Sequence, residues 1–139
     1  METIEEWIIE DICKAISQSG FSIEKGALPY LHATTNSKAR VVIYNPETVT
    51  LFELAEEMVH AQYRHSRQQR EYDVRNSNEG DAHQKALQYL LDRWCYYEGS
   101  ENWLTFVTVT GTPCEFSDDV ERYFDKDKKI ISQGHVSLA

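Results

Sequence analysis

Positive charge is scarce in this sequence. Its 139 residues include 14 Lys and Arg against 23 Asp and Glu, which gives a formal net charge of −9 at pH 7. An acidic surface repels the phosphate backbone of nucleic acids, and no basic run or module of stacking aromatic residues offsets that repulsion. The composition therefore argues against direct nucleic-acid binding and favours a protein or peptide partner.

Cysteines and long apolar runs are also few. Cys13, Cys95 and Cys114 form no CxxC pair, so the sequence indicates neither a disulfide framework nor a thiolate zinc site, and we expect all three to be packing residues. Apolar runs such as 41–43 are far too short to cross a bilayer, and the chain begins with acidic residues rather than a basic leader. These features predict a soluble, cytoplasmic protein without a membrane partner.

Length and composition fit a single domain over residues 1–139. Hydrophobic residues make up 41% of the chain and aromatic residues 12%, which is enough for a folded core. Apolar residues recur at helical intervals from Ile4 to Ile16, and Thr3 and Glu6 have capping-box spacing. This pattern predicts a first helix that ends near Gly20.

The middle of the chain predicts a small sheet followed by two long helices. The β-branched run Arg40–Tyr44 is the best strand, Leu28–Leu31 is a weaker partner, and the polar residues 33–37 between them read as a turn. A second helix is expected after Thr50 and runs to about Gln69. A frayed helix end and loop over 67–78 and a third helix over about 78–97 follow, with a last short helix near the end. The sequence thus predicts an α+β fold, mostly helical, with a small β-sheet beside the second helix.

That second helix carries the most informative pattern of the chain, Glu56-Glu57-Met58-Val59-His60. Residues four apart share one face of a helix, so Glu56 and His60 can reach a single metal ion. Glu57 lies about 100° further round, beside the position of a metal-bound water, where a carboxylate acts as a general base. The spacing is that of a metallopeptidase helix with glutamate in place of the usual first histidine.

A catalytic zinc needs three protein ligands and one open position for water. The natural source of the third ligand is the next helix, packed antiparallel against the motif helix. We prefer Glu79, at the predicted start of that helix, and Asp81 and His83 are alternatives. Glu79 and His83 share a helix face, whereas Asp81 lies about 200° from Glu79.

An ordinary amphipathic helix is the competing interpretation. In that case the acidic residues and the histidine of the motif form only its solvated side, because a five-residue motif without its first histidine often occurs by chance. His65 lies off the ligand face, and His32 and His135 fall in a predicted loop and tail. We expect no metal role for these three histidines.

The motif and its surroundings resemble the ImmA/IrrE family of zinc metallopeptidases, in particular its short members from phages and mobile elements of Gram-positive bacteria. Those proteins commonly read LAEELxH, and residues 54–60 here read LAEEMVH. Glu79, Ala82 and Ala86 resemble the family's third-ligand helix, which has glutamate followed by alanines three and seven residues later; another register makes Asp81 the ligand. The resemblance covers about residues 28–123 and implies a zincin-like fold.

This resemblance implies a metal-dependent endopeptidase that cleaves a transcriptional repressor or a similar regulator. Glu56, His60 and Glu79 are then the metal ligands and Glu57 is the catalytic base. Two carboxylate ligands neutralise a divalent ion, so we expect a less acidic bound water and slow turnover, and the ligand set accepts Mn²⁺ or Fe²⁺ as well as Zn²⁺. The alternative is a catalytically inactive domain of the same fold that binds a regulator.

Overall fold

The computed structural model describes the backbone of residues 2–63 and 72–125, and the side chains of 2–63 and 80–125. The elements, in chain order, are α1 (Ile4–Gln18), β1 (Ser22–Lys25), β2 (Ala33–Asn36), β3 (Val41–Tyr44), α2 (Leu51–Tyr63), α3 (Tyr72–Tyr96), α4 (Trp103–Thr110) and the 3₁₀ turn η1 (Cys114–Phe116). Residues 117–125 form a further helix. The fold is α+β and mostly helical with a small sheet, as the sequence predicts.

The first helix forms where its cap and apolar spacing predict it. The Oγ1 of Thr3 accepts a hydrogen bond from the backbone N–H of Glu6 at 3.2 Å, which satisfies one of the unpaired donors of the first turn. The chain turns away at Gly20, whose φ of 87° is readily adopted only by glycine. The side chains of Ile8, Ile12 and Ile16 are fully buried, and they anchor α1 to the core.

The sheet has the strand order β1-β3-β2, with β1 parallel and β2 antiparallel to β3. The predicted strand 40–44 is confirmed as β3. The strand prediction for Leu28–Leu31 and the turn prediction for 33–37 are wrong, because residues 33–36 form β2. Ala33 and Thr35 alternate inward and are buried, and that burial outweighs the turn preference of small polar residues.

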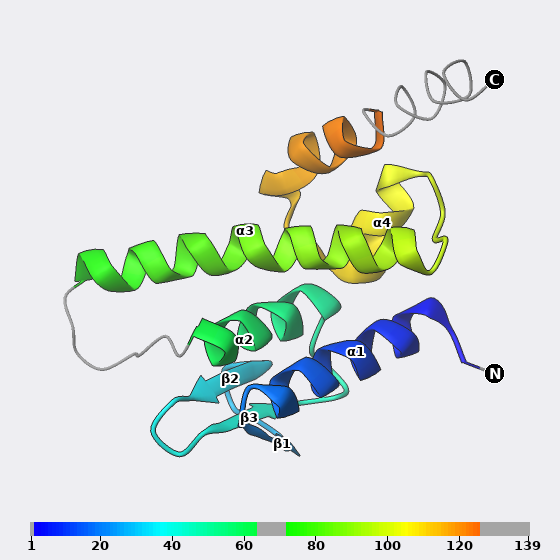
Figure 1. Ribbon diagram of the computed structural model, residues 1–139. Coiled ribbons are helices and arrows are strands. Elements are labelled where there is room, and N and C mark those ends of the chain that lie inside the picture. Colours follow the sequence, from blue (N-terminus) through cyan, green and yellow to red (C-terminus); the bar gives the residue numbers. More distant parts are fainter. Residues whose placement is uncertain (1, 64–71, 126–139) are drawn as a thin grey trace.

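Helix α2 lies between the sheet and α3, and α2 and α3 run antiparallel side by side (Figure 1). Its predicted apolar face is confirmed, since Leu51, Leu54, Ala55 and Met58 are all buried. On α3 the residues that pack inward also recur at helical spacing: Ala82, Ala86, Leu90 and Trp94. This pairing holds the motif helix between a sheet and a second helix.

Two local predictions need correction. Helix α3 begins at Tyr72, so the loop prediction for 67–78 is wrong for 72–78; a polar sequence hides a helix that has no apolar stripe there. The expected end of the motif helix near Gln69 lies outside the described residues. Cys95 and Cys114 are exposed, and Cys13 alone is partly buried, so the packing prediction fails for the first two.

Within the described ranges, no helix is long and apolar enough to cross a membrane.

Candidate metal centre

The start of the motif helix is fixed by the predicted capping box. The Oγ1 of Thr50 accepts a hydrogen bond from the backbone N–H of Glu53 at 3.1 Å, and the Oε1 of Glu53 accepts one from the N–H of Thr50 at 2.9 Å. The Glu53 carboxylate also lies 2.9 Å from Nδ1 of His32, in the loop before β2. Glu53 is therefore engaged in holding the beginning of α2 against that loop.

Glu57 points from α2 toward the sheet. Only 9% of its surface is exposed, and its Oε1 accepts a 2.6 Å hydrogen bond from the Thr35 hydroxyl on β2. A carboxylate out of water needs such donors, so Thr35 fixes the orientation of the predicted catalytic base. Sequence reasoning missed Thr35 because it assigned this segment to a turn; the adjacent β-branched pair, Thr34 and Thr35, was the available signal.

His60 is buried as well, with 5% of its surface exposed. It follows Glu56 by four residues and therefore lies on the same side of α2. The interpretation of the motif as a merely solvated helix face is wrong for Glu57 and His60, because both side chains are buried. Buried polar side chains are costly unless they have partners, so the burial of Glu57 and His60 depends on partners within the fold.

His83 of α3 meets Glu56 of α2. Its Nδ1 atom lies against the Oε2 atom of Glu56 within ion-pair distance, and Glu56 is largely shielded, with 15% of its side chain exposed. The contact does not have the geometry of a hydrogen bond, and the buried Nδ1 makes no hydrogen bond elsewhere. The two atoms therefore approach closely without forming a hydrogen bond. A nitrogen and a carboxylate oxygen brought together in this way suit a shared cation.

Two phenylalanines orient the His83 ring. Phe52, at the start of α2, stacks on it with ring centres 6.1 Å apart and an interplanar angle of 25°. Phe116 of η1 lies 5.8 Å from His83 and 5.8 Å from Phe52. The two aromatic rings thus form a clamp that keeps Nδ1 facing Glu56. Sequence reasoning did not identify either ring, because the contact joins three separate elements.

The three candidates for the third ligand have different positions. Asp81 is 44% exposed and pairs with Lys85 at 3.3 Å, one turn further along α3. Glu79 belongs to α3, one turn before His83, but its side chain lies outside the described residues. His83 is the candidate whose described side chain reaches Glu56. Among the side chains that the structure describes, no three metal-ligating groups are clustered closely enough to hold an ion.

No known protein family, curated protein or solved structure matches this chain significantly. The chemistry of the site therefore follows from its own geometry. That geometry offers two ligand-type side chains in contact, a buried histidine one turn away on the same helix, and a buried carboxylate held by a hydroxyl.

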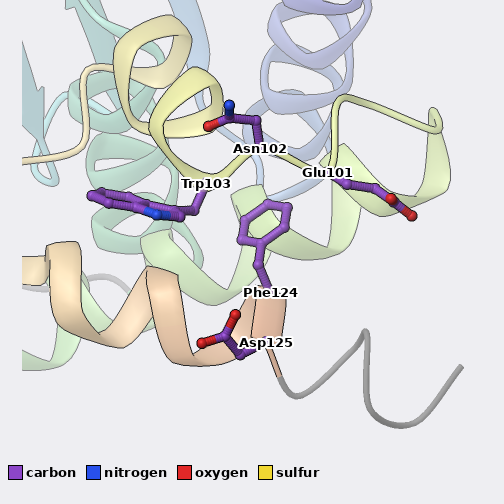
Figure 2. Close-up of a pocket in the computed structure, with 5 residues that line it drawn as sticks. All are labelled: Glu101, Asn102, Trp103, Phe124 and Asp125. Atoms are coloured by element: carbon purple, nitrogen blue, oxygen red, sulfur yellow. The ribbon is translucent and has the colours of Figure 1, made fainter. Parts of the chain in front are cut away.

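A separate pocket of about 330 Å³ lies at the start of α4 (Figure 2). Its lining combines two aromatic rings, two carboxylates and an amide: Glu101, Asn102, Trp103, Phe124 and Asp125. The amide belongs to the helix, because the Oδ1 of Asn102 caps α4 by accepting hydrogen bonds from the N–H groups of Leu104 and Thr105. None of the motif residues is among these lining residues, so this pocket is distinct from the candidate metal centre.

Proposed function

We propose that this protein is a zincin-like, metal-dependent endopeptidase of the ImmA/IrrE type. The observation that carries the proposal is the approach of the His83 Nδ1 atom to the Glu56 carboxylate, one helical turn from the buried His60. An imidazole nitrogen without a hydrogen bond, beside a carboxylate, fits the ligand chemistry of zinc. The same groups suit Mn²⁺ and Fe²⁺.

In this proposal Glu56 and His60 hold the ion from α2, and α3 supplies the remaining ligand from the face shared by Glu79 and His83. Glu79 is the ligand that the family resemblance implies, and His83 is the side chain whose position supports a site between the two helices. When bound, the ion supplies Lewis acidity, which lowers the pKa of water and polarises a peptide carbonyl.

The remaining catalytic roles belong to residues of α2 and β2. Glu57 accepts the proton of the attacking water at its carboxylate and returns it to the leaving amine. The Thr35 hydroxyl, donating to Oε1 of Glu57, keeps that carboxylate in one orientation while the reaction proceeds. In the described part of the chain β2 pairs with β3 alone, so its other edge is open to an extended peptide.

The substrate we propose is a regulatory protein of the cytoplasm, such as a transcriptional repressor. Repressors carry basic surfaces for DNA, and the net charge of −9 on this chain complements such a surface. The acidic charge also supports a protein rather than a nucleic acid as the direct partner.

Elemental analysis of protein purified without chelator tests the metal site. We expect stoichiometric metal in the wild type and in Glu57→Gln, and its loss in His60→Ala. Absence of metal from the wild type, even after Zn²⁺ or Mn²⁺ is added back, would contradict the proposal. With a repressor-like substrate, Glu57→Gln should bind without cleaving.

A non-enzymatic interaction domain is the second candidate. One observation favours it: Glu56 and His83 neutralise each other as an ion pair when the imidazole is protonated, which leaves no need for a cation. The same metal analysis separates the two functions, because the interaction domain binds its regulator without metal and is indifferent to Glu57→Gln.

A further inference from the structure

Three aromatic side chains from distant parts of the sequence meet at one surface, which we call the aromatic surface: Trp7 of α1, and Tyr96 and Tyr97 at the end of α3. The rings of Trp7 and Tyr97 lie 5.3 Å apart, and those of Tyr96 and Tyr97 lie 5.0 Å apart in an edge-to-face arrangement. Tyr96 is 67% exposed. Trp7 and Tyr97 are half-buried beside it, so the three rings form one contiguous aromatic group in which Tyr96 is the exposed member. A contiguous aromatic group at the surface indicates a binding surface.

Hydrogen bonds hold this surface in place before any partner arrives. The Tyr97 hydroxyl donates to Oδ2 of Asp11 at 2.5 Å, and Nη1 of Arg93 donates to the same oxygen at 3.1 Å. The bond to Asp11 raises the pKa of Tyr97, so its hydroxyl stays protonated. Trp7 is fixed by a 3.1 Å bond from its indole N–H to Glu2. A partner therefore loses little free energy in ordering these rings.

Arg93 shows what kind of group the rings accept. Its guanidinium lies over Tyr96, 4.4 Å from the ring centre, and 5.8 Å from the centre of the Tyr97 ring. Asp11 forms an ion pair with Arg93 at 3.1 Å, which offsets its charge. Most of the Tyr96 side chain remains exposed, so a second cation can stack on its ring as Arg93 does.

Four carboxylates lie close in sequence to the aromatic residues, on α1 and α3 or next to the ends of these helices. Glu2 contacts Trp7, and Glu10 follows Trp7 by one helical turn on α1. Asp92 precedes Tyr96 by one turn on α3, and Glu98 follows Tyr97 directly. All four of these acidic residues are exposed. The rim is therefore negative, and it complements a positively charged partner.

We propose that the aromatic surface binds a cationic protein segment, whose arginine or lysine side chains stack on Tyr96 and Trp7 while their charges face the surrounding carboxylates. Arginine, tyrosine and tryptophan are the residues most enriched at the energetic centres of interfaces. His83 and Tyr96 are 13 residues apart on one continuous helix, which separates this surface from the candidate metal centre by about 20 Å. The proposal does not depend on peptidase activity.

The test is a titration of the isotope-labelled full chain with octa-arginine at near-physiological salt, followed by NMR. We expect chemical-shift changes at the Trp7 indole and at residues 93–98, and Tyr96→Ala should weaken binding about three- to fivefold. Tyr30→Ala is the matched control, because Tyr30 is 94% exposed in the loop before β2, and it should bind as the wild type does.

Two results would overturn the proposal. Equal affinity of Tyr96→Ala and the wild type would mean that octa-arginine responds only to the overall negative charge. A wild-type dimer that dissociates on Tyr96→Ala substitution, measured by sedimentation, would assign the surface to a second copy of the chain. Unchanged circular dichroism of Tyr96→Ala confirms that a loss of affinity is local.

Discussion

The Nδ1 atom of His83 on α3 faces the Oε2 atom of Glu56 on α2, with the ring of Phe52 stacked on the imidazole. This contact connects the helix that carries the motif to the helix that follows it. In the proposed enzyme, the α3 face shared by His83 and Glu79 is the place from which a third ligand would reach the motif.

Replacing His83 with alanine should weaken Zn²⁺ binding by at least about 100-fold, since even indirect supporting contacts of metal sites contribute ten- to 100-fold. Phe116→Ala should cause a smaller loss, because it frees the ring without removing it. Competition with a chromogenic chelator measures both, and Gln84→Ala, at the exposed neighbouring position, is the control. If Glu79→Ala abolishes binding while His83→Ala does not, Glu79 alone is the third ligand.

Thr35→Val should lower the free energy of unfolding by about 1–3 kcal/mol, because the buried Glu57 carboxylate loses its hydroxyl donor while the size of the side chain is kept. Thr34→Val, on the neighbouring position of β2, should change stability by less than about 0.5 kcal/mol. Urea unfolding followed by circular dichroism compares the two. Equal stabilities would show that the hydrogen bond contributes nothing net. If the chain is the proposed peptidase, Thr35→Val should also reduce the cleavage rate.

Two glycine-to-alanine substitutions should have opposite effects. A Cβ atom on Gly99 would lie 2.4 Å from the Trp94 indole, which is buried and donates to the Ser100 carbonyl at 2.8 Å, so Gly99→Ala must displace a core ring. Gly80, inside α3, has nothing within 4 Å of the same atom, and Gly80→Ala should stabilise the protein by about 0.5–1 kcal/mol. Thermal unfolding measures both changes. A destabilised Gly80→Ala would contradict the continuous helix.

Stability should fall between about pH 10 and 12 because of Tyr89. Burial, together with the negative charge of Asp11, raises the pKa of Tyr89 to about 12 from an ordinary value of 10.0. In that interval the unfolded chain releases the phenolic proton and the folded chain keeps it, so the free energy of unfolding decreases as pH rises. Tyr89→Phe should reduce this pH dependence, and Tyr30→Phe should not. Urea unfolding across this pH range measures the stability of each protein. Identical profiles for the wild type and Tyr89→Phe would contradict the raised pKa of Tyr89.

Local sequence signals located the motif helix well. Capping and apolar spacing depend on residues three or four apart, so the sequence predicts the Thr50 and Glu53 capping box and part of the buried face of α2: Leu51, Leu54, Ala55 and Met58. The strand β2 could not be predicted in this way, because its pairing with β3 and its contact with Glu57 join residues far apart in the sequence. Small polar residues are typical of turns, and the sequence alone does not show that Ala33 and Thr35 face the core.

The choice among the candidates for the third ligand also depends on contacts between distant residues. Spacing alone left Glu79, Asp81 and His83 as candidates, because the register of α3 against α2 depends on how their apolar faces pack. The structure shows that His83 reaches Glu56 while Asp81 pairs with Lys85. The aromatic rings that orient His83 come from α2 and η1, and no short sequence pattern connects them.

Helix α3 is 25 residues long and carries His83 in its middle and the aromatic surface at its end. A helix of this length is stiff, so the separation of about 20 Å between the two positions is constant. An extended peptide covers that distance with about six residues. In the proposed peptidase, a protein anchored at the aromatic surface would therefore be cut at a set distance from its anchor, and α3 would act as a molecular ruler that sets the cleavage position by length rather than by local sequence.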